Sequence, residues 1–453
     1  MAKHILSKST FTYGCQCPKR LFLHKFKHEL ANPEDEQQQA IFQSGTNAGI
    51  LAQKLFEGGI DASPPDPFSY QKSVADTQEY LKTHDVIYEA AFQFDGVMCA
   101  VDILVREGKK WHAYEVKSTN SVKDQHKLDA ALQYYVIKSS GLPLSDFSVV
   151  TFNKKYVRIG EIKVHELFVA ESVKKFCEEQ TEFIASKIDE LKKMLAAKIE
   201  PVIEPGDFCF EPYECNFTQH CWKDIPKEVE EVDETDVPYL DKKALKEFTN
   251  QIKYPLYYFD FETVMYGVPE FDYSSPYQQI PFQFSLHVQK SADAEVEHFA
   301  FLGDGIKDPR EKLIESMLNL LGNEGSIFGW WISFEQGRIK ELAKNFPKYE
   351  KELLAINERM VDLIEPFKSE AFYHPGFNGS ASLKNVLPVV VPELSYSALN
   401  IQEGGTASFV YGQLKNMDEQ TAAENMNDLL EYCKLDTLAM VKIFERIEII
   451  ISE

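Results

Sequence analysis

The alternation of apolar and polar residues predicts both helices and strands along the chain. Residues 183–198 and 429–447 place apolar residues at helical spacing among good helix formers. Residues 254–264 are aromatic and rich in β-formers, as expected of a buried strand. Residues 94–120 predict two strands joined by a turn at Glu-Gly-Lys-Lys, followed by a helix over 128–141. This mixture predicts an α/β protein.

The length of 453 residues suits two or three domains. Residues 223–250 begin with an acidic run that has few large apolar side chains, which is typical of a linker leading into a short helix. We therefore expect a first domain over 1–222, an acidic linker over 223–250 and a second domain over 251–453. Each domain is predicted to be a mixed sheet flanked by helices.

The composition and net charge exclude some classes of protein. Hydrophobic residues make up 44% of the chain, which excludes wholesale disorder. The net charge of −23, from 71 acidic and 48 basic residues, argues against binding polyanions through bulk charge. It does not exclude enzymes that meet nucleic acid through carboxylate-bound metal ions. We expect no membrane span and no secretory signal, and hence a cytoplasmic protein.

Four of the eight cysteines form a candidate metal-binding set. Cys209, Cys215 and Cys221 follow one another at six-residue steps, and Cys17, with Cys15 as its rival, could supply the fourth ligand. Ligation by thiolates alone suits an iron–sulfur cluster or zinc. The lack of a closely spaced pair among the three favours iron–sulfur. The alternative is that they are small buried side chains, which is how we interpret Cys99, Cys177 and Cys433.

Asp102, Glu115 and Lys117 form a candidate catalytic group in the first half. Side chains alternate along a strand, so Glu115 and Lys117 project from one face. Asp102 and Glu115 could hold a divalent metal while Lys117 stabilises charge on the reacting phosphate. This spacing resembles the PD-(D/E)xK nuclease signature, and Gln133 on the next helix resembles the substrate-holding Gln of RecB-like nucleases. With the cysteines, the first half resembles the iron–sulfur branch of that family, although Gly49 stands where many relatives have a metal-binding His.

The second half carries a different carboxylate pattern. Asp260 and Glu262 share one strand face, and Tyr432 and Asp436 share one helix face. Carboxylates converging on two metal ions are what in-line phosphodiester hydrolysis requires. The pattern resembles the DnaQ-like (DEDD) 3′–5′ exonucleases, in which Tyr432 would orient the attacking water. Glu335 occupies the middle motif, with Trp331 in place of its usual Asn. Asp362 in the stretch Arg-Met-Val-Asp-Leu-Ile could line the cleft, but we favour an ordinary residue at the end of a strand.

Both halves together resemble a bacterial family that fuses a RecB-like iron–sulfur nuclease domain to a DnaQ-like, RNase-H-like exonuclease domain. The resemblance implies a restriction-endonuclease-like fold followed by an RNase-H-like fold, a [4Fe–4S] cluster, and Mg²⁺ or Mn²⁺ held by Asp102 and Glu115 and by Asp260, Glu262, Glu335 and Asp436. The expected activity is hydrolysis of nucleic acid, DNA before RNA. Two alternatives remain: one catalytic half with a nucleic-acid-binding clamp, or a non-enzymatic interaction protein stapled by zinc.

Overall fold

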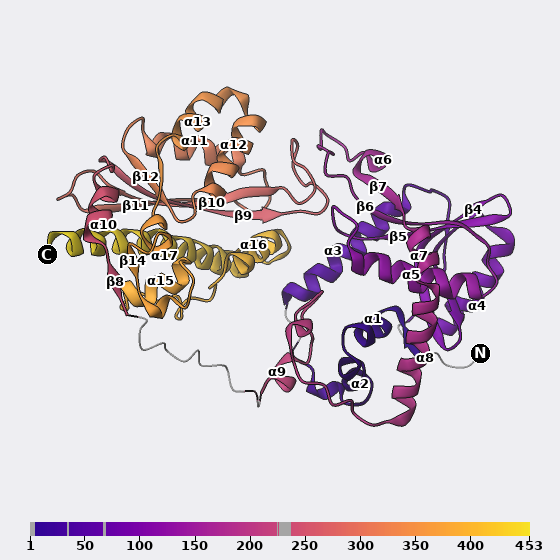
Figure 1. Ribbon diagram of the computed structural model, residues 1–453. Coiled ribbons are helices and arrows are strands. Elements are labelled where there is room, and N and C mark those ends of the chain that lie inside the picture. Colours follow the sequence, from indigo (N-terminus) through magenta and orange to yellow (C-terminus); the bar gives the residue numbers. More distant parts are fainter. Residues whose placement is uncertain (1–4, 34–35, 67–68, 224, 226–236) are drawn as a thin grey trace. The chain divides into compact units, whose positions relative to one another are not determined.

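The protein has two α/β units with mixed sheets, as predicted. The computed structural model describes residues 5–33, 36–66, 69–223, 225 and 237–453, with the backbone alone over 36–44. Unit 1 comprises Met1–Lys227 and Gly267–Tyr277, and unit 2 comprises Glu228–Tyr266 and Gln278–Glu453 (Figure 1). Within the expected linker, residues 224 and 226–236 lie outside the described residues. The rest of it includes strand β8 (Tyr239–Leu240) and helix α10 (Lys242–Thr249).

Unit 1 is built on one mixed sheet in the order β2-β3-β4-β5-β6-β7, with β1 paired to the start of β4. The strands are β1 (Leu6–Ser7), β2 (Ile60–Asp61), β3 (Val86–Phe94), β4 (Val97–Glu107), β5 (Lys110–Val116), β6 (Leu144–Phe152) and β7 (Phe168–Ser172). Strands β3, β4 and β5 are antiparallel neighbours, whereas β5 and β6 run parallel. A parallel pair needs a crossover connection, which helix α5 (Asp124–Ser139) provides here.

Helices cover both faces of this sheet. They are α1 (Lys8–Gln16), α2 (Pro18–Phe26), α3 (Glu36–Gln53), α4 (Tyr70–Thr83), α5 (Asp124–Ser139), α6 (Val164–Leu167), α7 (Lys174–Glu179), α8 (Thr181–Ala197) and α9 (Thr218–Cys221). One core joins α5 and α8 to β5 through residues such as Trp111 and Ala113. A second core on the other face joins Ala48 and Ala52 of α3 to Tyr114. Glu115 therefore projects towards α5, because side chains alternate along β5.

Residues 267–277, which connect strands β9 (Leu256–Met265) and β10 (Gln279–Gln289) of unit 2 in the sequence, are part of unit 1. The Arg158 guanidinium donates to the carbonyls of Pro269 and Glu270 at 3.0 and 2.6 Å. The hydroxyls of Tyr277 and Ser118 lie 2.9 Å apart, and Ser118 directly follows Lys117. The predicted first domain, residues 1–222, thus lacks residues 267–277, which the structure places in unit 1.

Unit 2 contains a sheet in the order β11-β10-β9-β12-β13. The strands are β9 (Leu256–Met265), β10 (Gln279–Gln289), β11 (Val296–Leu302), β12 (Ser326–Gly329) and β13 (Met360–Asp362), and β14 (Phe372–Tyr373) pairs separately with β8. The first three are antiparallel, and β12 and β13 continue the sheet parallel to β9. The central position of β9 places its side chains beneath helices on both faces.

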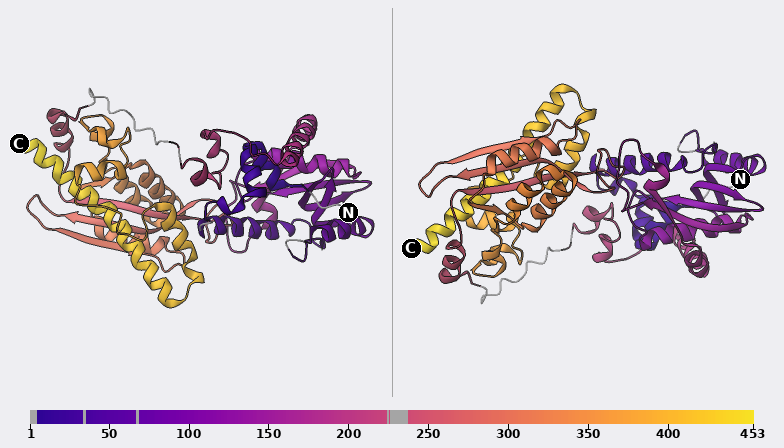
Figure 2. Two further views of the ribbon diagram at one scale, coloured as in Figure 1. Left: turned by 90° about the horizontal axis from the view of Figure 1, so that it is seen from below. Right: turned by 90° about the horizontal axis from the view of Figure 1, so that it is seen from above.

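The helices of unit 2 lie on both sides of that sheet. They are α10, α11 (Arg310–Leu321), α12 (Ser333–Asn345), α13 (Glu350–Asn357), α14 (Glu365–Lys368), α15 (Leu383–Val390), α16 (Gly404–Gln413) and α17 (Glu419–Ser452). Figure 2 shows α17 crossing the strands diagonally. Tyr257, Phe259 and Phe261 pack against α11, α12 and α13, whereas Leu256 and Tyr258 pack against α17. By alternation, Asp260 and Glu262 face α17.

Among the helices that the structure describes, none is both long and apolar enough to span a bilayer.

Candidate functional site

Four acidic side chains converge in unit 2 from three elements. Strand β9 presents Asp260 and Glu262, α12 presents Glu335, and α17 presents Asp436. Glu262, Glu335 and Asp436 are between 2 and 9% exposed. Helix α17 begins at the N-cap Asp418, whose side chain accepts the backbone N–H groups of Gln420 and Thr421, and it continues unbroken past the site. All four carboxylates expected from the sequence therefore lie close enough to influence one another.

Burial and mutual repulsion disfavour negative charge on these four carboxyl groups. Burial raises the pKa of Glu262 and of Glu335 to about 8, and that of Asp436 to about 6. Burial and then the charges of Asp436, Glu262 and Glu335 raise the pKa of Asp260 well above its usual range. Lys384 offsets the effect only in part, by lowering the pKa of Glu262 and Asp436. A bound divalent cation would relieve this repulsion.

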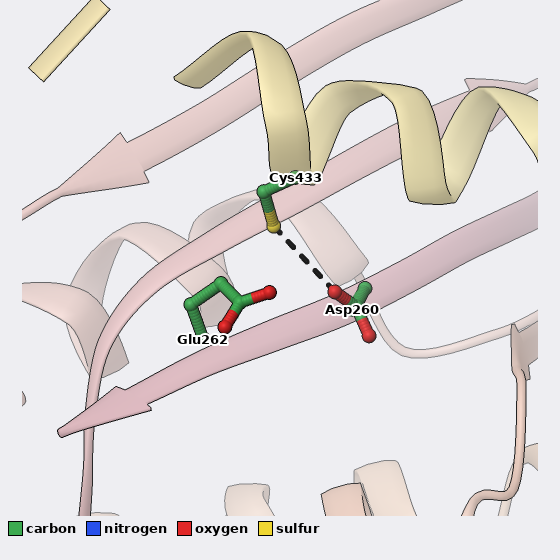
Figure 3. A group of neighbouring side chains, drawn as sticks. All are labelled: Asp260, Glu262 and Cys433. Carbon is green, nitrogen blue, oxygen red and sulfur yellow. Dashed lines mark hydrogen bonds between the residues drawn. The ribbon is translucent and has the colours of Figure 1, made fainter. Parts of the chain in front are cut away.

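The donor atoms suit a metal ion. Ligand atoms of Asp260, Glu262 and Cys433 lie within 4.8 Å of one another, and the Cys433 thiol donates to Asp260 Oδ2 at 3.6 Å (Figure 3). Glu335 Oε2 is buried and has no hydrogen-bond partner among the described residues. Sequence reasoning interpreted Cys433 as packing because its neighbours are helix formers. The structure instead places its sulfur against the carboxylates.

Two tyrosines approach the same carboxylates. The Tyr396 hydroxyl donates to Asp436 Oδ1 at 2.5 Å, and Tyr432, one turn before Asp436 on α17, is 4% exposed. Hydrogen bonds from both hydroxyls lower the pKa of Asp436 against the effect of burial. Burial and the neighbouring carboxylates raise the pKa of Tyr432, so its hydroxyl keeps its proton. Tyr396 lies in a loop between α15 and α16, and sequence reasoning did not single it out as a functional residue.

The start of α12 is fixed by Asp362. Its carboxylate accepts the backbone N–H groups of Trp331 at 2.9 Å and of Ile332 at 3.2 Å. This capping supports the interpretation of Asp362 as structural, and it positions Glu335 in the first turn. Trp331 adopts φ of 69° and is 57% exposed. An exposed tryptophan in left-handed backbone beside a carboxylate site stores strain of the kind found at functional positions.

The candidate group of unit 1 surrounds Glu115. Lys117 Nζ lies 3.1 Å from Glu115 Oε1 and 2.7 Å from Asp129 Oδ2. Lys8, at the start of α1, lies 2.6 Å from the same Glu115 oxygen. Burial alone would raise the pKa of Glu115, but the charges of the two lysines hold it at about 2. Sequence reasoning missed Lys8 because it lies 107 residues before Glu115 in an N-terminal segment without a recognisable catalytic motif.

Asp102 and Gln133 also belong to this group. Asp102 Oδ2 accepts the backbone N–H of Val116 at 2.5 Å. Gln133 on α5 is completely buried, and neither atom of its amide has a hydrogen-bond partner among the described residues. Burial and then the charge of Glu115 raise the pKa of Asp102 to about 7. On α3, the space around Gly49 where a side chain would begin is open. No side chain from that position reaches the group.

Glu89 is a further carboxylate that the sequence did not reveal. It interrupts the pairing of β3 with β4 opposite Asp102, since Tyr88 pairs with Ile103 and Ala90 with Val101. Its φ of 53° is unusual for a strand residue other than glycine. Burial and then the charges of Asp102 and Glu115 raise its pKa to about 8. Nothing in the local sequence marks this position, because the carboxylate meets Asp102 only when β3 and β4 pair in this register.

The four predicted cysteine ligands line one cavity of unit 1. Cys17 lies between α1 and α2, and the other three come from residues 209–221. Cys15 is not among the lining residues and packs against the core instead. Burial raises the pKa of Cys215 and Cys221, while Arg20 lowers that of Cys215 and Lys19 that of Cys221. Four thiols with cationic neighbours fit an iron–sulfur cluster or zinc.

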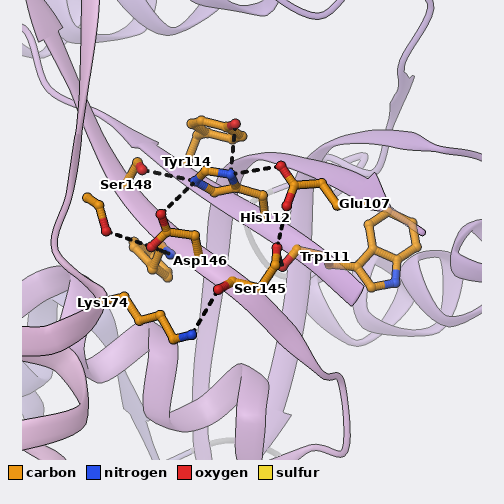
Figure 4. Close-up of polar contacts among 10 residues, drawn as sticks. Glu107, Trp111, His112, Tyr114, Ser145, Asp146, Ser148 and Lys174 are labelled. Carbon is orange, nitrogen blue, oxygen red and sulfur yellow. Dashed lines mark hydrogen bonds and ion pairs between the residues drawn. The ribbon is translucent and has the colours of Figure 1, made fainter. Parts of the chain in front are cut away.

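A polar network around His112 lies on the opposite face of β5 from Glu115 (Figure 4). Its Nδ1 lies 3.2 Å from Glu107 and 2.9 Å from the Tyr114 hydroxyl, and its Nε2 lies 2.9 Å from the Ser148 hydroxyl. Both ring nitrogens therefore have partners within the protein. Ser148 is 3% exposed, so the Ser-His-Glu arrangement offers no accessible nucleophile. We interpret this network as structural.

Comparison with known proteins adds a partial match. Residues 257–382 match the family described as "Domain of unknown function (DUF2779)". The chain is 28% identical over 229 residues to "Uncharacterized protein MG366 homolog" of Mycoplasma pneumoniae, which is 45% of this chain and 34% of the relative. It is 29% identical over 218 residues to "Uncharacterized protein MG366" of Mycoplasma genitalium, 43% of this chain and 32% of the relative. The matched region thus spans about a third of these curated relatives (34% and 32%).

Proposed function

We propose that the protein is a metal-dependent nuclease whose unit 2 is a 3′–5′ exonuclease of the DnaQ-like class acting on DNA. The observation that carries this proposal is the convergence of Asp260, Glu262, Glu335 and Asp436 on one buried site, with Tyr432 beside them. The strand order of unit 2, with three antiparallel strands followed by two parallel ones, supports an RNase-H-like assignment.

The residues of unit 2 have distinct roles in this proposal. The four carboxylates would hold two Mg²⁺ or Mn²⁺ ions, which when bound polarise the phosphodiester and activate water. Tyr432, kept protonated by its surroundings, positions the attacking water through its hydroxyl. Tyr396 holds Asp436 in place, and Lys384 is near enough to meet a phosphate oxygen.

Unit 1 would carry a second, RecB-like nuclease centre. Asp102 and Glu115 would bind the metal ion, and Lys117, 3.1 Å from Glu115, would stabilise charge on the reacting phosphate. Gln133, buried on α5, would hold the substrate near the metal. Glu89 adds a third carboxylate beside Asp102. Four thiols on Cys17, Cys209, Cys215 and Cys221 would hold a [4Fe–4S] cluster, which a reducing cytoplasm would preserve.

The ion pairs of Glu115 favour a second candidate function for unit 1. Lys8 and Lys117 both contact the same oxygen of Glu115, so that carboxylate is already neutralised without a metal ion. In the alternative, unit 1 is a nucleic-acid-binding clamp and hydrolysis belongs to unit 2 alone. The lysines would then contact phosphates rather than assist cleavage.

Cleavage of a labelled oligonucleotide in Mn²⁺ by matched variants tests these roles. Glu262→Gln and Lys117→Ala each remove one centre, and His112→Gln, on the opposite face of the unit 1 sheet, is the control. If both centres are active, Glu262→Gln loses only the cleavage products of unit 2 and Lys117→Ala only those of unit 1. The His112→Gln control forms the products of both units. If Lys117→Ala cleaves like the wild type, the clamp hypothesis is favoured. Full activity in Glu262→Gln would overturn the assignment of unit 2.

A further inference from the structure

The position of Cys433 is not explained by exonuclease chemistry or by core packing. Its side chain is completely buried, yet it belongs to neither of the two hydrophobic clusters that line the sheet of unit 2. Two other buried cysteines, Cys99 and Cys177, do lie within a hydrophobic cluster in unit 1. The sulfur of Cys433 instead has the carboxylate of Asp260 as its hydrogen-bond partner.

The geometry directs the sulfur into the carboxylate group. Cys433 Sγ is 3.6 Å from Asp260 Oδ2, and the sulfur and single oxygens of Asp260 and Glu262 all lie within 4.8 Å of one another (Figure 3). Cys433 and Asp436 are one helical turn apart, so both project from α17 towards β9. Independently, Glu335 Oε2 at this site is buried and lacks a hydrogen-bond partner among the described residues. A buried carboxylate oxygen without a partner in the protein is available to a cation.

We propose that Cys433 is a metal ligand together with Asp260 and Glu262, which makes this a mixed thiolate–carboxylate site. Carboxylates alone suit hard cations such as Mg²⁺, whereas a thiolate selects softer ions of the Zn²⁺, Co²⁺ and Cd²⁺ class. Binding forms a sulfur–metal bond, and the thiol proton passes to solvent buffer. This inference rests on the proposed function, because it specifies which cation the exonuclease site prefers.

Metal binding by the full-length protein, purified with its unit 1 cysteine site filled, tests the inference without relying on activity. Cd²⁺ and Mg²⁺ affinities are measured by calorimetry for the wild type, Cys433→Ser and Asp260→Asn, with Cys99→Ser as the matched buried-thiol control. Only the metal binding that is lost in Asp260→Asn is assigned to the site at Asp260. We expect Cys433→Ser to weaken Cd²⁺ binding on the order of 100-fold and Mg²⁺ binding by less than about threefold. The Cys99→Ser protein should resemble the wild type.

A second measurement remains valid if Cys433→Ser does not fold. Co²⁺ bound by a thiolate gives a sulfur-to-metal charge-transfer band in the near ultraviolet, and carboxylate-bound Co²⁺ does not. A band that is present in the wild type and absent from Asp260→Asn supports the inference. Co²⁺ binding that needs Asp260 but gives no such band overturns it and leaves the exonuclease proposal intact. Binding of neither Co²⁺ nor Cd²⁺ at Asp260 contradicts both.

Discussion

At the scale of single residues, the buried carboxylates of unit 2 link stability to pH. The pKa of Glu262 and of Glu335 is raised from 4.5 to about 8. A carboxyl group whose pKa is higher in the folded than in the unfolded protein favours folding in its protonated form. That contribution is fully present below about pH 4.5 and is lost as the pH rises through about 8.

We therefore predict that the metal-free protein loses stability between pH 5 and pH 8, and that Glu262→Gln reduces this loss. Thermal unfolding in a chelator across this range measures the effect. Glu393→Gln, which changes an exposed carboxylate of unit 2, is the control and should follow the wild type. The same slope in Glu262→Gln and the wild type would contradict the electrostatic description of the site.

Trp331 gives a second prediction at this scale. The residue is 57% exposed beside the carboxylates, where a base of single-stranded nucleic acid could stack on its ring. We expect Trp331→Ala to weaken binding of a single-stranded oligonucleotide by about 5- to 10-fold, and Trp331→Phe to retain most of the affinity. Fluorescence anisotropy in Ca²⁺ instead of a catalytic metal measures this without cleavage.

Trp331→Gly separates stacking from backbone strain. Glycine adopts φ of 69° without a steric cost, so this variant should be more stable than Trp331→Ala by about 1 kcal/mol while binding equally weakly. Unchanged affinity in both variants would exclude a stacking role.

At the scale of elements, strands β5 and β6 are joined by side chains as well as by their backbones. His112 on β5 bonds Ser148 on β6, and Ser145 donates to Glu107 at the end of β4. We predict that His112→Ala lowers the free energy of unfolding by about 1–3 kcal/mol, because it leaves the buried Ser148 hydroxyl without this partner. Chemical denaturation tests this, with the exposed His165→Ala as the control. Equal stability of the two variants would show that the network contributes little.

The sequence predicted the elements that carry the strongest patterns. The helix predicted over 183–198 overlaps α8 (Thr181–Ala197), and the one over 429–447 lies within α17. The aromatic stretch 254–264 overlaps β9 (Leu256–Met265). In each of these elements most of the large apolar residues that predicted it are buried in the structure. Buried positions of α8 such as Ile184, Ile188 and Leu191 recur at helical spacing.

The parts that sequence reasoning missed depend on contacts between distant segments. Lys8 reaches Glu115 from the N-terminal helix, and Glu89 lies opposite Asp102 in the register of β3 with β4. Tyr396 reaches Asp436 from a loop, and Cys433 has the same local pattern as a packing residue. Residue type and spacing do not determine such contacts, because they are set by tertiary packing.

At the scale of the whole molecule, the cysteine cavity joins segments far apart in unit 1. Cys17 follows the first helix, whereas Cys209, Cys215 and Cys221 lie near the end of that unit's long segment. The Arg20 guanidinium also donates to Asn216 at 3.2 Å, which connects the same two segments. A metal centre here would close a long loop of chain and stabilise the fold.

We predict that anaerobically purified protein has a broad absorption band near 400 nm, that Cys209→Ser loses it, and that Cys15→Ser keeps it. The same Cys209→Ser change should lower the unfolding temperature of unit 1. Colourless protein with stoichiometric zinc would instead identify a zinc site and favour an interaction protein. Absorption spectra with iron and zinc analysis distinguish the two.

The exonuclease assignment of unit 2 is the central claim, and the polarity of cleavage tests it most directly. The measurement is a time course in Mn²⁺ on single-stranded DNA labelled at the 5′ end, with a parallel substrate labelled at the 3′ end. We predict that the 5′-labelled strand shortens stepwise, that the 3′ label is released at once as a mononucleotide, and that Asp436→Asn abolishes both. Intact DNA, or a ladder that persists in Asp436→Asn, would contradict the account.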